Sequence, residues 1–228
     1  MRRLVLTSLL LLLALAPRAR ARGVDQDFQV WAPVVLQATY RPVRLWVEVQ
    51  PRMIDDAGRL GFMIYRPALA WLTPVEGLSL WGGYAFVERV DRRYTREHRA
   101  WQQVQYDHTI EELGRLRFIH RLRAEQRFLQ DRDPVAHRLR WLLRGSLPLA
   151  FEGRLMAIGW NEFFFNVNTV EGGPRRGFDQ NRTFFGPGVQ VTRWTRVEVG
   201  YLAQYFHRVR AEDDLNHVLF ASLWIDLP

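Results

Sequence analysis

Residues 115–129 carry the pattern that most constrains the fold of this chain. One parity of the run is charged and the other is apolar: Arg115, Arg117, Arg121, Arg123, Glu125 and Arg127 alternate with Leu116, Phe118, Leu122, Ala124 and Phe128. Successive side chains of a β-strand point to opposite faces, so this run predicts a strand with one charged face and one apolar face. The charged face therefore needs a polar environment, and the apolar face needs an apolar one.

The same period-two alternation recurs along the chain, whereas helical periodicity is nearly absent. It predicts strands at 28–38, 43–54, 59–72, 78–89, 96–108, 115–129, 136–147, 154–167, 178–191, 195–207 and 216–227. Most of these runs exceed the roughly five to six residues usual in soluble proteins, and they match the ~9 to 11 residues that cross a bilayer. We therefore expect an all-β fold with no helical domain.

The cost of placing Arg in hydrocarbon decides which face meets lipid. Each Arg would cost about 2 to 4 kcal/mol near the bilayer midplane, so a face with several of them must line an interior. This indicates an antiparallel, up-and-down transmembrane β-barrel with a polar, Arg-rich lumen. Alternation alone does not distinguish inside from outside, so a soluble periplasmic β-barrel binding protein stays open as an alternative.

Strand number and topology follow from the connections between the runs. Eleven runs conflict with the even number usual in bacterial single-chain barrels, so we expect 10–12 strands and prefer twelve. Tight turns such as Tyr40-Arg41-Pro42 and Thr192-Arg193-Trp194 alternate along the chain with charged loops such as residues 89–96 and 168–177. Short periplasmic turns and longer external loops are typical of outer-membrane barrels.

The N-terminal residues indicate export. Arg2 and Arg3 precede an apolar run from Leu4 to Ala16, and Ala19-Arg20-Ala21 follows as a small-residue cleavage site. The run is too short for a spanning helix, which needs about 20 residues, so residues 1–21 are predicted to be a secretory signal peptide and 22–228 a single barrel domain. The absence of Cys excludes disulfides and lipidation. The pI near 10.6 suggests nucleic acid, but an exported chain without a recognition motif makes that partner unexpected.

Several motifs together resemble a known family. They are WxEVQPR (Trp46 to Arg52), EHRxWQQ (Glu97 to Gln103), RLRxEQRF (Arg121 to Phe128), GWNExFFNxN (Gly159 to Asn168), GFDQNRxFxG (Gly177 to Gly186), GYLxQY (Gly200 to Tyr205) and NHVL (Asn216 to Leu219). In this order they are similar to the domain of unknown function 2490 family, uncharacterised bacterial proteins thought to be outer-membrane barrels. The resemblance covers nearly the whole chain after the leader. It implies location and architecture, and it carries no established activity or ligand.

Parity assigns the residues that should line the interior. The expected lumen network consists of Arg44, Glu48, Gln50, Arg52, Glu97, Arg99, Gln103, Arg121, Arg123, Glu125, Arg127, Arg138, Arg140, Arg144, Glu162, Asn166, Gln180, Arg182, Arg196, Glu198 and Gln204. In the hairpin from Gly159 to Arg182 we expect Glu162 and Arg182 to pair across neighbouring strands. Asn166, Asn168 and Asp179 at the outer mouth are the first residues among which we expect a ligand site, if the protein has one.

An Arg-rich lumen favours anions, although the same side chains could form a closed structural network. The sequence therefore predicts an integral outer-membrane protein of a Gram-negative envelope, acting as a narrow anion-preferring channel or small-solute transporter, or structurally. Its expected partners are outer-membrane lipid, lipopolysaccharide and, during biogenesis, the barrel assembly machinery. A lipid- or lipopolysaccharide-modifying enzyme is the competing hypothesis. However, none of Ser79, Ser146 and Ser222 lies two residues from a His on the same strand face, and nothing selects a cross-strand pair such as His207 with Ser222, so we expect no enzyme. The scattered His residues predict no metal site, and nothing indicates a cofactor.

Overall fold

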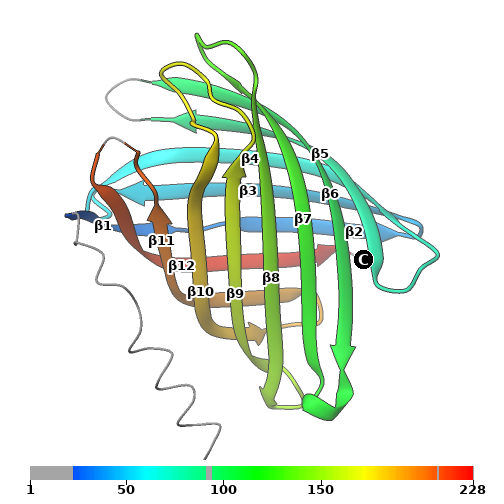
Figure 1. Ribbon diagram of the computed structural model, residues 1–228. Coiled ribbons are helices and arrows are strands. Elements are labelled where there is room, and N and C mark those ends of the chain that lie inside the picture. The colour runs from blue at the N-terminus through cyan, green and yellow to red at the C-terminus, as the bar shows by residue number, and fades with distance from the viewer. Residues whose placement is uncertain (1–22, 91–93, 210, 228) are drawn as a thin grey trace, which may run out of the picture.

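The computed structural model describes residues 23–90, 94–209 and 211–227, which form a barrel of β-strands (Figure 1). The predicted leader at 1–21 lies outside the described residues. The strands are β1 (Val24–Trp31), β2 (Val34–Tyr40), β3 (Val43–Ile54), β4 (Arg59–Leu72), β5 (Leu78–Arg89), β6 (Thr95–Ile110), β7 (Leu116–Leu129), β8 (Ala136–Ala150), β9 (Leu155–Asn166), β10 (Gly177–Gln190), β11 (Thr195–Phe206) and β12 (Asp213–Leu227). A 3-10 turn, η1 (Glu111–Leu113), joins β6 to β7.

Neighbouring strands from β2 to β12 pair antiparallel in chain order, and the first strands close the ring. Both β1 and β2 pair parallel with β12, at Trp31 opposite Phe220 and at Val34 opposite Leu223, and both pair antiparallel with β3. They follow one another along the same gap, so together they fill one place in the ring. The described part of the chain contains twelve strands, and eleven places in the ring are therefore filled.

The all-β barrel and the preferred count of twelve strands are confirmed. The predicted strand at 28–38 is β1 and β2, interrupted at Ala32 and Pro33, where proline has no N–H to give to the sheet. An odd ring is possible because its closing pair is parallel. The expected antiparallel arrangement holds for every other pair in the ring.

The two ends of the barrel differ. At the end that we call the turn end, residues 41–42, 73–77, 111–115, 151–154 and 191–194 make the connections. At the loop end, the connections include residues 130–135 and 167–176. Val24 begins beside Asp213 at the loop end, and Leu227 finishes beside Ala38 at the turn end. The first and last strands thus place their outer ends at opposite ends of the barrel.

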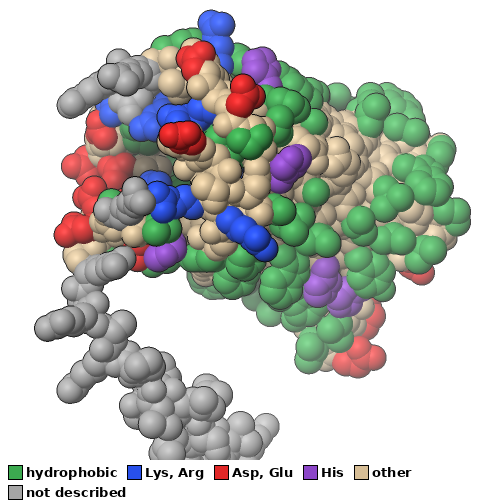
Figure 2. Space-filling view, turned by 45° about the horizontal axis from the view of Figure 1, so that its top comes forward, with side chains coloured by type: hydrophobic (Ala, Val, Ile, Leu, Met, Phe, Trp, Pro, Cys, Tyr) green, Lys and Arg blue, Asp and Glu red, His purple; other side chains and the backbone are tan. Residues whose placement is uncertain are grey.

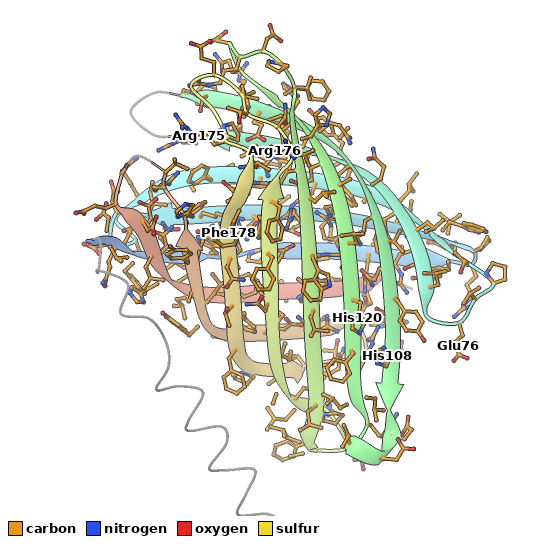
Figure 3. All side chains as sticks on the ribbon, in the orientation of Figure 1. Glu76, His108, His120, Arg175, Arg176 and Phe178 are labelled. Carbon is orange, nitrogen blue, oxygen red and sulfur yellow. The ribbon has the colours of Figure 1, made fainter. Side chains whose placement is uncertain are left out.

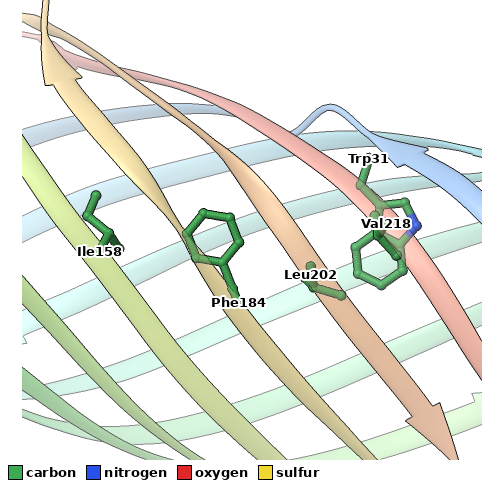
Figure 4. Packing of buried hydrophobic residues seen from close by; sticks show 5 residues of the cluster. All are labelled: Trp31, Ile158, Phe184, Leu202 and Val218. Carbon is green, nitrogen blue, oxygen red and sulfur yellow. The ribbon is translucent and has the colours of Figure 1, made fainter.

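The interior is not uniformly polar. A cluster formed by Trp31, Ile158, Phe184, Leu202 and Val218 is almost completely buried inside the wall of β1 and β9 to β12 (Figure 4). A second buried cluster on β4 to β6 contains Ala68, Ala85 and Trp101. These clusters fill part of the barrel, so the charged side chains are held in a partly solid interior.

The outer surface is largely apolar, and charged side chains gather near the loop end (Figure 2). Large hydrophobic residues stand exposed along the strands, among them Leu122 at 54%, Phe185 at 69% and Tyr201 at 51%. In the described part of the chain no helix has the length and apolarity needed to cross a membrane.

Candidate functional site

The interior contains two cavities stacked along the barrel. The larger, about 1590 Å³, is open at the loop end, and we call it the vestibule. The smaller, about 250 Å³, lies towards the turn end. Five interior residues line both: Trp31, Arg52, Arg66, Arg140 and Arg182. These side chains form the floor of the vestibule.

Two carboxylates on β7 and β9 hold the arginines of the barrel centre, and we call this group the carboxylate belt. Arg138 donates to Glu125 Oε2 at 2.6 Å, and Arg140 donates to Glu125 Oε1 at 2.6 Å. Arg140 also donates to Glu162 Oε1 at 2.7 Å, and Arg121 reaches the same oxygen at 2.7 Å. Glu125, Glu162, Arg138 and Arg140 are each at most 5% exposed. Buried charges need this close pairing because an isolated one would be very unfavourable.

The pattern of one carboxylate shared by two arginines is repeated elsewhere inside the barrel. Glu97 accepts hydrogen bonds from Arg99 and Arg127 near the vestibule. Glu198 accepts from Arg144 at 2.7 Å and from Arg196 at 2.9 Å, nearer the turn end. Because each carboxylate serves two guanidiniums, the interior keeps an excess of positive charge even where it is fully paired.

Arg52 and Arg182 are held differently. The Arg52 guanidinium carbon lies 3.6 Å from the centre of the Trp31 indole, and that of Arg182 lies 5.0 Å from it. Arg182 also lies 4.6 Å from the centre of the Phe164 ring. The hydrogen-bond partners are neutral amides: Arg52 donates to Gln50 at 2.9 Å, and Gln204 lies 3.1 Å from Arg182 Nη2. Among the residues that the structure describes, neither guanidinium has an ion pair with a carboxylate within 4 Å.

The structure places the sequence-predicted lumen residues on the inner face of the barrel. Arg123 donates to Gln103 and lies over Trp101, whereas Arg44, at the turn end, donates to Thr39. Gln204 contacts Gln180, and Asn166 is buried at the top of β9. These residues, the belt and the other paired carboxylates all lie on the inner face of the barrel, as the alternation predicts.

The expected pair between Glu162 and Arg182 is wrong as an ion pair. The two residues are opposite one another on β9 and β10, as the alternation requires. However, the Glu162 carboxylate turns the other way, to Arg140 and Arg121. Arg121 is two strands away, and the residue between them in the same row is Leu142, whose short side chain leaves room for the contact.

The outer-mouth residues have separate roles. Asn168 is a loop residue whose side chain accepts from the His137 N–H at 2.7 Å and donates to the Val135 carbonyl at 2.9 Å. Asp179 lines the vestibule, 3.6 Å from Arg138 Nη1. The structure therefore brings Asp179 into the cavity and uses Asn168 to hold the loop between β9 and β10 against β8.

Interior aromatic residues are the part of the site that parity did not single out. Trp31 has the same parity as Gln29, and Phe164 has the same parity as Glu162, so alternation is the signal that could have placed both on the inner face. Neither side chain is charged, so the pattern of Arg and Glu on the inner face did not indicate them. Aromatic rings beneath guanidiniums are a usual arrangement for arginine, which stacks on such rings while its N–H edges stay free.

Serine and histidine side chains are engaged in local contacts. Ser79 and Ser222 accept hydrogen bonds from the indoles of Trp81 and Trp224. Figure 3 shows His108 and His120 on β6 and β7 towards the turn end, where their rings stack with centroids 5.3 Å apart. Across residues 23–90, 94–209 and 211–227, no three His, Cys, Asp or Glu side chains gather in a way that could hold a metal ion.

The fold and the interior define a small β-barrel protein with an arginine-lined cavity open at one end. Residues 28–216 match the family model described as protein of unknown function (DUF2490), and the chain belongs to this family. An uncharacterized protein of Methylorubrum extorquens is 35% identical over 226 residues, covering 98% of this chain and 97% of the relative. No solved structure matches the chain.

Proposed function

We propose that this protein is an integral barrel of the outer membrane of a Gram-negative bacterium whose interior is an anion-preferring passage for small solutes. One observation carries the first part of the proposal: burial is reversed relative to a soluble barrel. Leu122, Phe165, Phe185 and Tyr201 are exposed on the outer wall, while Glu125 and Glu162 are buried inside. Large contiguous apolar surfaces are rare on soluble monomers, and hydrocarbon is the solvent that suits this one.

The charge of the interior supports the second part. Arginines outnumber carboxylates in both cavities, and rings of arginine favour anions. The floor residues narrow the route between the cavities, so we expect the passage to conduct small ions and to exclude larger solutes. With no conduction, the same barrel has a structural role in the envelope.

Fractionation and conductance test the proposal directly. The full chain should sediment with outer membranes and require detergent for extraction. In planar bilayers under a salt gradient, its reversal potential should show anion preference. Release without detergent would favour a soluble periplasmic barrel, and a cation preference or no conductance would refute the passage.

A matched pair of substitutions tests the lipid-facing surface. Leu122 lies mid-strand on the outer wall and is 54% exposed, whereas Leu113 lies in the η1 turn and is 56% exposed. Leu122→Arg should destabilise the barrel by about 2 to 4 kcal/mol in lipid, and Leu113→Arg by much less, because only the former enters hydrocarbon. The measurement is urea unfolding in lipid vesicles followed by Trp fluorescence. Equal, negligible effects would indicate that water surrounds both positions.

A further inference from the structure

We propose that the floor of the vestibule is a binding site for a compact dianion, a phosphoryl group, held between Arg52 and Arg182. The inference rests on the proposed anion preference and names the chemical class and place of the ligand. The phosphoryl group can belong to a free phosphate monoester or to a phosphorylated lipid headgroup. Both present the same terminal oxyanions to the floor.

Charge pairing distinguishes these two arginines from the others on the inner wall of the vestibule. Arg89 and Arg96 are exposed near its mouth. The five other strand arginines that line it are buried or half-buried, and each has an ion pair with a carboxylate: Arg66 with Glu48, Arg99 and Arg127 with Glu97, Arg138 with Glu125, and Arg140 with Glu125 and Glu162. Arg52 and Arg182 face amide oxygens and aromatic rings in place of acids. Their two positive charges remain to be neutralised, and one dianion balances both.

Geometry favours one compact ligand group over two separate anions. Both guanidiniums lie over the same indole, at 3.6 and 5.0 Å from its centre, so the two charges are held beside one ring of the floor. Trp31 is itself fixed, because its Nε1–H donates to Gln29 at 2.9 Å and it is 2% exposed. Stacking orients a guanidinium while leaving its N–H edge available, and that edge matches the oxygens of a phosphoryl group. A dicarboxylate spreads its charges over two groups and fits this arrangement less well.

The vestibule provides both access and direction. Its mouth has charges of both signs, with Asp25, Asp27 and Asp55 among the acids and Arg96 and Arg132 among the bases. Below the mouth the lining becomes mainly arginine, with Glu97 and Asp179 as the acids facing the cavity. A negative solute is therefore drawn towards the floor, where low dielectric strengthens the contact.

Calorimetric titration of the full, detergent-folded chain tests the site. The probes are inorganic phosphate, phenyl phosphate, succinate and chloride, with mixed micelles containing phosphatidic acid as the lipid form. Arg52→Gln and Arg182→Gln should each weaken phosphate binding roughly tenfold or more, because a charge-assisted hydrogen bond is lost. Arg44→Gln is the matched control: Arg44 has no ion pair with any described carboxylate either, but it lines the smaller cavity towards the turn end and donates to Thr39. The dissociation constant of this variant for phosphate should stay within about twofold of that of the original chain, because Arg44 does not contact the proposed site.

The outcomes separate the ligand source and the proposed function. If phosphate and phenyl phosphate compete, and Arg52→Gln and Arg182→Gln weaken the binding of both, the ligand is a free solute. If only the micelles with phosphatidic acid bind, and the same two substitutions weaken that binding, the ligand is a lipid headgroup.

Three results overturn the site: succinate or chloride binds more tightly than phosphate, phosphate does not bind, or Arg44→Gln loses as much phosphate affinity as the two floor variants. Anion conductance with unchanged phosphate affinity in both floor variants refutes the site and leaves the passage. Phosphate binding at the floor without conductance refutes the passage and leaves the site. A gel shift on heating in SDS checks that each variant is folded.

Discussion

The carboxylate belt and the vestibule floor lie next to one another and use the same cation in opposite ways. In the belt, Arg138 and Arg140 are held by Glu125 and Glu162 at 2.6 to 2.7 Å. On the floor, Arg52 and Arg182 lie over Trp31 and face neutral amides. Pairing with a carboxylate uses up a guanidinium's charge, whereas stacking leaves it available. The belt therefore serves the wall, and the floor is where the barrel can still bind an anion.

Removing a belt carboxylate should have the largest effect. Glu125→Gln leaves Arg138 and Arg140 buried without the charge that both contact, and breaking a buried ion pair from one side costs about 3 to 5 kcal/mol. Urea unfolding in detergent, followed by Trp fluorescence, measures the change in the free energy of unfolding. Glu111→Gln is the control, because Glu111 and Arg115 form an exposed pair at 3.6 Å and should contribute nothing measurable. A similar, small loss in both variants would mean that the belt is hydrated and weak.

Removing the ring shared by both regions should have an intermediate effect. Phe164 is completely buried, and the guanidiniums of Arg138, Arg140 and Arg182 lie 5.1, 4.5 and 4.6 Å from its centre. Phe164→Leu keeps an apolar side chain but removes the aromatic face, which should cost about 2 kcal/mol. Phe165→Leu on the same strand is the control, since Phe165 is 43% exposed on the outer wall. If the two variants unfold at the same urea concentration, the interior ring has no special role.

Neutralising Arg52, a floor arginine that is stacked on Trp31 and not paired with a described carboxylate, should have the smallest effect on folding. Arg52→Gln removes stacking on Trp31 but also removes an unneutralised buried charge, so the free energy of unfolding should change by no more than about 1 kcal/mol. Arg140→Gln is the contrasting variant: Arg140 also reaches the floor, but it is paired with both belt glutamates, and its loss should cost about 3 to 5 kcal/mol. The same urea titration compares them. Equal destabilisation would show that the floor is as structural as the belt, and the distinction between the two regions would fail.

Alternation gave the strands and their inner faces because it depends only on the two-residue period of the strand. The run from Arg115 to Phe128 needs no knowledge of its neighbours to divide into two faces. Alternation could not predict which arginine pairs with Glu162, because that choice depends on the stagger between strands and on the size of Leu142. The break at Ala32 and Pro33 was hidden for a related reason: both halves keep the same parity, and only pairing with β3 and β12 shows that they fill one place.

The parallel seam between the first and last strands also has a consequence for sidedness. Because an odd number of strands stands around the ring, a polypeptide that enters the wall at Val24 leaves it at Leu227 on the other side. If the wall spans a bilayer as proposed, anything fused before β1 is displayed in one aqueous compartment and anything fused after β12 in the other. Two reporter domains fused to the two ends of one chain would then lie on opposite sides of the membrane.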